Sequence, residues 1–129
     1  MYIVLDTSVV IDIEKGIEQT KQRLLSVKSE GNFLPAITSI TYTELLHGYL
    51  KIGKSRKEVD SVLDKYFLLN TSKDSSKIAA EFMHYLEVKG KMIPTADILI
   101  ASISADKNSV FVTKDNHFKN IPNLRCVFI

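Results

Sequence analysis

The chain has 129 residues, of which 45% are hydrophobic, and a formal net charge of +2 at pH 7. This length suits one ordinary domain with a core of its own, so we expect a single domain over residues 1–129. The one cysteine, Cys126, excludes an intrachain disulfide, and three scattered histidines without a CxxC pair argue against structural zinc. No apolar run approaches the ~20 residues of a membrane helix, and the N-terminal segment lacks the basic start of a signal peptide. We therefore expect a cytoplasmic protein with no membrane contact.

Hydrophobic patterning predicts two strands and three helices in the first part of the chain. The continuous apolar run YIVLD is typical of a strand that is buried on both faces. FLPAIT predicts a second strand, in which Pro35 must lie near the start or at an edge. The expected elements are a strand at 2–6, helices at 7–14 and 17–30, a strand at 33–38 and a helix at 39–53.

In the rest of the chain, predicted helices again alternate with predicted strands. Ser55 is typical of a helix cap, and Gly90 of a helix end. TADILIASISADKN is apolar nearly all round, which predicts a buried helix. The expected elements are a helix at 55–67, a short strand at 67–71, helices at 74–90 and 95–108, and strands at 109–113 and 124–129.

Strands that alternate with helices predict an α/β fold, namely a three-layer α/β/α domain with a central, mainly parallel sheet of four to five strands. In such sheets, functional groups collect just beyond the carboxyl ends of the strands. Asp6 and Asp115 both stand at the carboxyl ends of predicted strands.

Two carboxylates near the N-terminus also have ordinary structural explanations. Asp6 is a candidate N-cap for the helix that follows it. Glu44 stands three residues after Thr41, so TYTE is a candidate capping box in which Glu44 reaches back to the Thr41 backbone N–H. Read alone, neither residue distinguishes a structural role from a functional one.

The same holds for two later carboxylates. Thr95 is a candidate cap for the helix in which Asp97 would complement the positive end of the helix dipole. Asp115 lies among turn-forming residues, where an aspartate is common.

Taken together, the four carboxylates can converge on one rim of the sheet. Buried like charges raise one another's pKa unless a cation neutralises them. A hard divalent cation such as Mg²⁺ or Mn²⁺ takes oxygen ligands of this kind and suits phosphodiester hydrolysis. The sequence offers no better nucleophile, because it has neither a GxSxG elbow nor a GxxxxGK[ST] loop.

Four motifs occur in the order VLDTSVVID, TYTELLHG, TADILIASI and VTKDNHF. In their order and spacing they resemble the PIN-domain ribonucleases, especially the VapC-type toxins of prokaryotic toxin–antitoxin pairs. The resemblance spans essentially the whole chain. It implies a PIN-like fold and metal-dependent endoribonuclease activity with one or two Mg²⁺ or Mn²⁺ ions. The catalytic metal ligands that it implies are Asp6, Glu44, Asp97 and Asp115.

The resemblance also implies two supporting hydroxyls. Ser8 and Thr113 match positions where the family places groups that support the carboxylates or a water. The sequence departs from the family pattern at His117, where many relatives carry an acid before the phenylalanine that corresponds to Phe118. This leaves Asp115 as the fourth acid and puts a secondary ligand at position 117 in doubt.

The partners that the resemblance implies are an RNA substrate, a cognate small antitoxin that binds near the acidic cleft, and a second copy of the chain. The helices between Tyr42 and Tyr66 are the expected contact of this homodimer.

Three other functions remain open. A housekeeping RNA-processing PIN nuclease would use the same residues. A non-catalytic PIN-like module would only bind RNA or protein, although four converging carboxylates argue against it. A receiver-type signalling domain needs adjacent acids after its first strand, whereas Asp6 is followed by Thr7.

Overall fold

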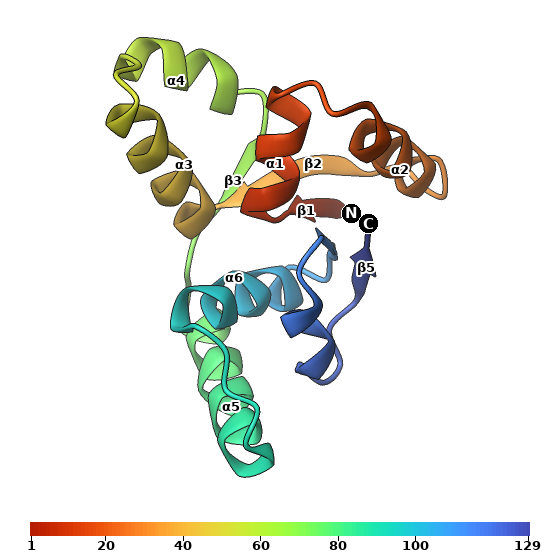
Figure 1. The fold of residues 1–129 in the computed structure, drawn as a ribbon. Helices are drawn as coiled ribbons and strands as arrows, with labels where there is room; N and C mark the ends of the chain where they lie inside the picture. The colour runs from red at the N-terminus through yellow and green to blue at the C-terminus, as the bar shows by residue number, and fades with distance from the viewer.

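The computed structural model describes residues 1–129 and has a five-stranded sheet at its centre (Figure 1). Neighbouring strands all pair in parallel, in the order β3-β2-β1-β4-β5. This confirms the predicted parallel sheet and its size. The strands are β1 (Tyr2–Leu5), β2 (Leu34–Thr38), β3 (Phe67–Leu69), β4 (Val110–Thr113) and β5 (Cys126–Phe128).

Helices cover both faces of the sheet, which confirms the predicted three-layer arrangement (Figure 1). The first four pack on one face, whereas the last two and a 3₁₀ helix, η1, pack on the other. No helix combines the length and the apolar composition that a membrane crossing requires. The helices are α1 (Thr7–Glu14), α2 (Glu18–Lys28), α3 (Ser39–Lys51), α4 (Arg56–Leu63), α5 (Lys73–Lys89), α6 (Thr95–Asp106) and η1 (Asn116–Asn120).

Two hydrophobic cores, one on each face of the sheet, hold these layers together. Ile3 and Leu5 of β1 pack in the core beneath α1 to α4. Val4 instead packs with Phe111 of β4 in the core beneath α5 and α6. Because successive side chains of a strand point to opposite faces, a doubly covered strand needs an apolar residue at every position. This requirement explains the uninterrupted run at the start of the sequence.

Pro35 lies at the second position of β2, which is an inner strand of the sheet. Leu34 donates its N–H to Met1, on the β1 side. The nitrogen of the next residue, Pro35, therefore faces the opposite side, where pairing with β3 begins only at Ala36. The missing N–H thus costs no hydrogen bond to β3, and the predicted position near the strand start is confirmed.

Most helix ends follow the predicted signals. The helix over residues 7–14 has the predicted bounds, and Ser55 caps α4 by accepting a hydrogen bond from the Glu58 N–H at 3.2 Å. The helix α5 ends at Gly90, whose φ of +65° lies in the left-handed region that glycine adopts without steric cost.

Two predicted caps are wrong. Thr38, not Thr41, caps α3, because its hydroxyl accepts a hydrogen bond from the Thr41 N–H at 3.1 Å. The proposed capping box between Thr41 and Glu44 therefore does not form, and the Glu44 carboxylate is free for another contact. In α6 the N-cap is Pro94, and Thr95 is already the first helical residue.

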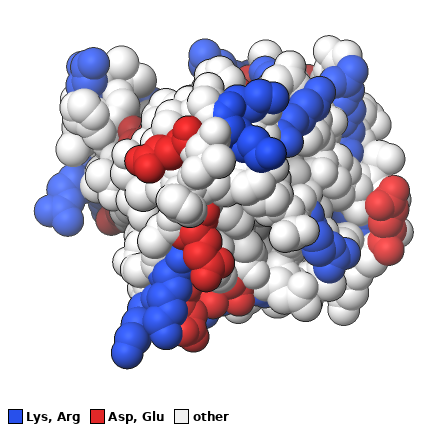
Figure 2. All heavy atoms as spheres, turned by 90° about the horizontal axis from the view of Figure 1, so that it is seen from below, with Lys and Arg blue, Asp and Glu red and all other residues white.

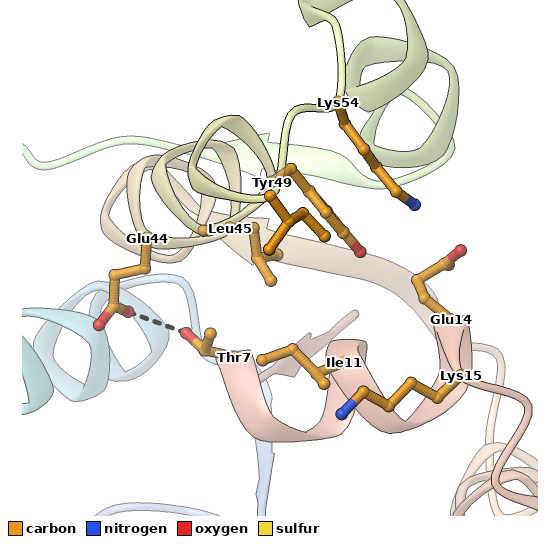
Figure 3. Close-up of a pocket in the computed structure, with 10 residues that line it drawn as sticks. Thr7, Ile11, Glu14, Lys15, Glu44, Leu45, Tyr49 and Lys54 are labelled. Atoms are coloured by element: carbon orange, nitrogen blue, oxygen red, sulfur yellow. Dashed lines mark hydrogen bonds between the residues drawn. The ribbon is translucent and has the colours of Figure 1, made fainter.

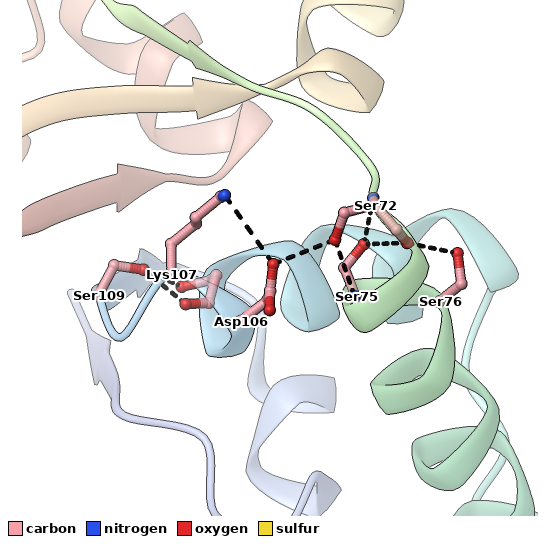
Figure 4. Close-up of polar contacts among 7 residues, drawn as sticks. Ser72, Ser75, Ser76, Asp106, Lys107 and Ser109 are labelled. Carbon is pink, nitrogen blue, oxygen red and sulfur yellow. Dashed lines mark hydrogen bonds and ion pairs between the residues drawn. The ribbon is translucent and has the colours of Figure 1, made fainter.

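Polar contacts fix the relative position of α5 and α6 at the end of α6 that lies away from the rim (Figure 4). Ser72 and Ser75 form a reciprocal capping box at the start of α5. The Ser72 hydroxyl also donates to Asp106 Oδ2, in the last turn of α6, at 3.2 Å. This contact restrains α6 and with it the position of its opposite end, which carries Asp97.

The polar segment between the last two strands contains a short helix that the sequence did not predict. Asp115 caps η1 by accepting a hydrogen bond from the His117 N–H at 2.9 Å. Phe118 is buried and contacts Phe111 with ring centroids 4.8 Å apart. One buried aromatic side chain thus anchors an otherwise polar turn.

We expect Phe111→Ala to lower the free energy of unfolding by about 3–5 kcal/mol, because it empties a fully buried position of the core. Phe67→Ala is the matched control, since Phe67 is also a strand phenylalanine but is 51% exposed. Urea unfolding followed by circular dichroism measures both variants. Equal losses would contradict the assignment of Phe111 to the core.

Candidate functional site

The carboxyl ends of β1, β2 and β4 form one rim of the sheet. From β1 the chain passes to β2 on one side and returns later to β4 on the other, with connecting helices on opposite faces. Such a change in strand order opens a crevice at the carboxyl ends of the two strands. Asp6 directly follows β1, and Asp115 follows β4 by two residues. The N-terminal parts of α3 and α6 add Glu44 and Asp97.

Asp6 lies at the centre of this rim and is only 7% exposed. Its Oδ1 accepts the Thr7 N–H at 2.9 Å, so Asp6 is the N-cap of α1. Its Oδ2 accepts the Thr113 hydroxyl at 2.6 Å. Burial raises the pKa of Asp6, while these two hydrogen bonds oppose the rise. The capping interpretation is therefore confirmed, and it leaves the carboxylate facing the other acids.

Thr113 connects two acidic residues of the rim. It is fully buried at the end of β4, and its hydroxyl donates to Asp6 while accepting the Asp115 backbone N–H at 3.0 Å. One side chain therefore fixes the carboxyl ends of two adjacent strands relative to each other.

Asp97 lies in the first turn of α6 and has the most strongly shifted carboxyl pKa. Burial raises the pKa of Asp97 to about 6, and the negative charges of Asp6, Asp115 and Glu44 act in the same direction. The only ion pair of the four acids is the contact of Asp115 with His117. No lysine or arginine therefore compensates their negative charge.

Glu44 is exposed on α3 and reaches the site through a contact that the sequence did not predict. Its Oε1 accepts the Thr7 hydroxyl at 2.8 Å (Figure 3). Thr7 thus does more than begin α1, because it also ties the start of α1 to α3. No local pattern indicates a contact between residues that lie 37 positions apart.

The Ser8 hydroxyl oxygen is buried and has no hydrogen-bond partner in the protein. An unsatisfied buried polar group costs about 1–3 kcal/mol, so such atoms are uncommon away from functional sites. Ser8 lies in the first turn of α1, two residues after Asp6.

His117 is a member of the site that the sequence placed in doubt. Its Nδ1 lies 3.3 Å from Asp115 Oδ1. Asp97, Asp115 and His117 each offer a ligand atom, and these three atoms all lie within 4.8 Å of one another. Asp6 and Glu44 are not members of this group of three, and one carboxylate oxygen of each accepts a hydrogen bond from a threonine hydroxyl.

The sequence matches the PIN domain over residues 3–124. The chain belongs to the PIN domain family. Two curated relatives of this PIN domain are ribonucleases. Ribonuclease VapC3 of Methanocaldococcus jannaschii is 36% identical over 103 residues, which are 80% of this chain and 98% of the relative. Ribonuclease VapC2 of Rickettsia felis is 30% identical over 128 residues, which are 96% and 95% of the two chains.

Solved structures agree with this PIN-domain fold. A chain in the crystal structure of VapBC2 from Rickettsia felis, bound to a DNA fragment from its promoter, matches with a TM-score of 0.83 and 30% identity. The match covers 100% of this chain and 99% of that one. A chain of VapBC-1 from nontypeable Haemophilus influenzae also has a TM-score of 0.83, at 19% identity, over 99% and 98% of the two chains.

The donor set of this PIN domain fits a hard divalent cation. Four carboxylates converge without a lysine or arginine partner, and the buried hydroxyl of Ser8, two residues after Asp6, has no partner in the protein. Mg²⁺ and Mn²⁺ take oxygen ligands of this kind and would neutralise the negative charge that burial, and then the neighbouring acids, make unfavourable at Asp97.

We expect Asp97→Asn to stabilise the metal-free PIN domain near pH 7.5. The folded-state pKa of about 6 lies above the usual 3.8, so ionisation of Asp97 opposes folding progressively from about pH 4 to pH 6, and fully above that. The shift corresponds to at most about 3 kcal/mol. Screening at this partly exposed carboxylate reduces the gain to about 1–2 kcal/mol.

Thermal unfolding in EDTA at pH 4 and pH 7.5 measures this effect, with Asp64→Asn, an exposed carboxylate after α4, as the control. Equal effects of Asp97→Asn at the two pH values would contradict the electrostatic assignment.

Proposed function

We propose that this PIN domain is a metal-dependent endoribonuclease that hydrolyses RNA phosphodiester bonds as the toxin of a type II toxin–antitoxin system. The observation that carries the activity is the convergence of Asp6, Asp97 and Asp115 at one sheet rim, with Glu44 close by. RNA as the substrate class is supported by the two curated relatives, both of which are named ribonucleases. We further propose that the chain forms one domain over residues 1–129 and acts in the cytoplasm.

The proposed metal ligands are Asp6, Glu44, Asp97 and Asp115, with Mg²⁺ or Mn²⁺ as the ion. The chemistry that such an ion supplies is the activation of water and the neutralisation of charge on the phosphate oxygens. Thr113 orients the Asp6 carboxylate through its 2.6 Å hydrogen bond, and Thr7 restrains Glu44. Ser8 offers a free hydroxyl for a water at the rim.

Lysines of α5, the segment after it and η1 support binding of the RNA backbone, which an acidic site alone would repel. Figure 2 views the molecule from the side of α5 and shows groups of basic side chains there, separated by acidic ones. Lys89, Lys91 and Lys119 line a hollow of about 300 Å³ together with Tyr85 and Asn120. Lys119 belongs to η1, the same short helix that carries His117. Cationic side chains of this kind contact phosphates without regard to sequence.

An antitoxin can dock in the hollow between α1 and α3, which starts beside Glu44 (Figure 3). This hollow of about 380 Å³ has apolar walls that include Ile11, Leu45 and Tyr49. An amphipathic segment with its apolar face in this groove could extend a basic side chain to the carboxylates. The VapBC complexes among the similar structures support a partner of this kind.

A second copy of the chain is the other proposed partner. The helices α3 and α4 remain the predicted contact, and the exposed apolar side chains of Leu50 and Ile52 at the end of α3 support it. These two residues are 47% and 70% exposed.

We expect Asp6→Asn and Asp97→Asn each to lower the rate of RNA cleavage by about 100-fold or more, because even groups that only support a metal ligand typically contribute about 10- to 100-fold. EDTA should abolish wild-type cleavage, and Mn²⁺ or Mg²⁺ should restore it. A labelled total-RNA substrate resolved on a denaturing gel gives both the rates and the cleavage ends. Asp64→Asn should cleave like the wild type, whereas full activity in either site variant would overturn the assignment.

For the toxin role, we expect expression of the chain alone to arrest bacterial growth, while Asp97→Asn at an equal protein level does not. Colony counts after induction measure the difference. If both strains grow normally although the purified wild type cleaves RNA, the housekeeping RNA-processing alternative is favoured.

A further inference from the structure

We propose that His117 is a nitrogen ligand of the metal site and makes it favour Mn²⁺ and the later transition ions over Mg²⁺. This inference rests on the proposed metal-dependent function and adds a ligand beyond the four carboxylates. It concerns which ion the site selects, not whether it binds one.

The start of η1 places the imidazole next to the site. Asp115 Oδ1 accepts the His117 backbone N–H at 2.9 Å, and the Nδ1 atom of the same residue lies 3.3 Å from that oxygen. This turn directs the ring and the carboxylate to the same side. Asp97 reaches the pair from α6, so two separate elements supply the three groups.

The spacing of these three groups suits a common ion. Two ligand atoms that each lie about 2.1 Å from an ion are at most about 4.2 Å apart. The ligand atoms of Asp97, Asp115 and His117 lie within 4.8 Å of one another. The side chains of His117 and Asp115 are 64% and 39% exposed, so small rotations of these side chains can close the remaining few tenths of an ångström.

The nitrogen donor has a definite consequence for ion selection. Mg²⁺ favours oxygen ligands, whereas imidazole suits transition ions, and affinities rise from Mn²⁺ through Co²⁺ to Ni²⁺. A site with carboxylates alone would accept Mg²⁺ readily. One imidazole beside two carboxylates therefore shifts the preference toward Mn²⁺ and Co²⁺.

The alternative is an ordinary ion pair between His117 and Asp115 at the protein surface. Exposed pairs of this kind contribute little to stability and impose no preference among divalent ions. The two explanations predict different ion selectivity and different spectra of the bound ion, so binding experiments separate them without RNA.

The experiment compares the full-length wild type with His117→Asp, which makes the donor set all-oxygen. His84→Asp on α5 is the matched control, because His84 is another exposed histidine on a helix. Isothermal titration with Mn²⁺, Co²⁺ and Mg²⁺ gives the affinity ratios, and pulsed electron paramagnetic resonance of bound Mn²⁺ detects a coordinated ¹⁴N nucleus.

We expect ¹⁴N coupling from an imidazole in the wild type and in His84→Asp, but not in His117→Asp. The ratio of Co²⁺ to Mg²⁺ affinity should fall by about tenfold or more in His117→Asp, since loss of a supporting group alone costs about 10- to 100-fold. Bound Mn²⁺ without imidazole coupling in the wild type, or an unchanged ratio, would overturn this proposal and leave the carboxylate site intact. No binding of any ion to the wild type would overturn both proposals.

Discussion

The hydrogen bond from the Thr113 hydroxyl to the Asp6 carboxylate is the interaction on which the candidate site depends. It joins the carboxyl ends of β1 and β4 at 2.6 Å, and the same hydroxyl accepts the Asp115 N–H. Thr113 is fully buried, so its position is set by the packing of β4 rather than by solvent-exposed loops. Two acids from opposite ends of the sequence are thereby held in one fixed relation.

The rest of the site lowers the stability of the folded chain, because buried carboxylates of like charge lie close together. Burial and mutual repulsion raise the pKa of Asp97 to about 6, no lysine or arginine pairs with the four acids, and the Ser8 hydroxyl has no partner. A chain selected for stability alone would not keep such an arrangement. The two well-packed cores on either side of the sheet offset this cost.

The sequence allowed most of the fold to be predicted, because local signals agreed with the tertiary structure. The run at 2–5 is apolar at every position since β1 is covered on both faces, and Gly90 ends α5 in the conformation that glycine favours. The start of α3 at Ser39 was predicted, but its cap was not, because Thr38 and Thr41 are equally good local caps and only the end of β2 decides between them. The helix η1 depends on the burial of Phe118 in a distant core, which a polar segment does not reveal.

For the candidate site, the sequence allowed the four carboxylates to be named, but it did not predict the side-chain contacts that hold them in place. The places of Asp6 and Asp115 followed from the rule that strand ends meet at one edge. The bond from Thr7 to Glu44 could not be predicted, because it joins two helices through side chains 37 residues apart. His117 was undervalued for a similar reason, since its place near Asp97 depends on the tertiary core that η1 and α6 share.

The long separation between Asp6 and Thr113 also has a consequence for the nascent chain. These residues lie 107 positions apart, and β1 pairs with β4 only after almost the entire sequence has been made. At about 5–20 residues per second, the ribosome makes Thr113 roughly 5–20 s after Asp6. Throughout that interval the Asp6 carboxylate lacks its strand partner, and Asp115 does not yet exist. Because β1 pairs with a strand near the end of the sequence, the acidic rim assembles only when synthesis is nearly complete.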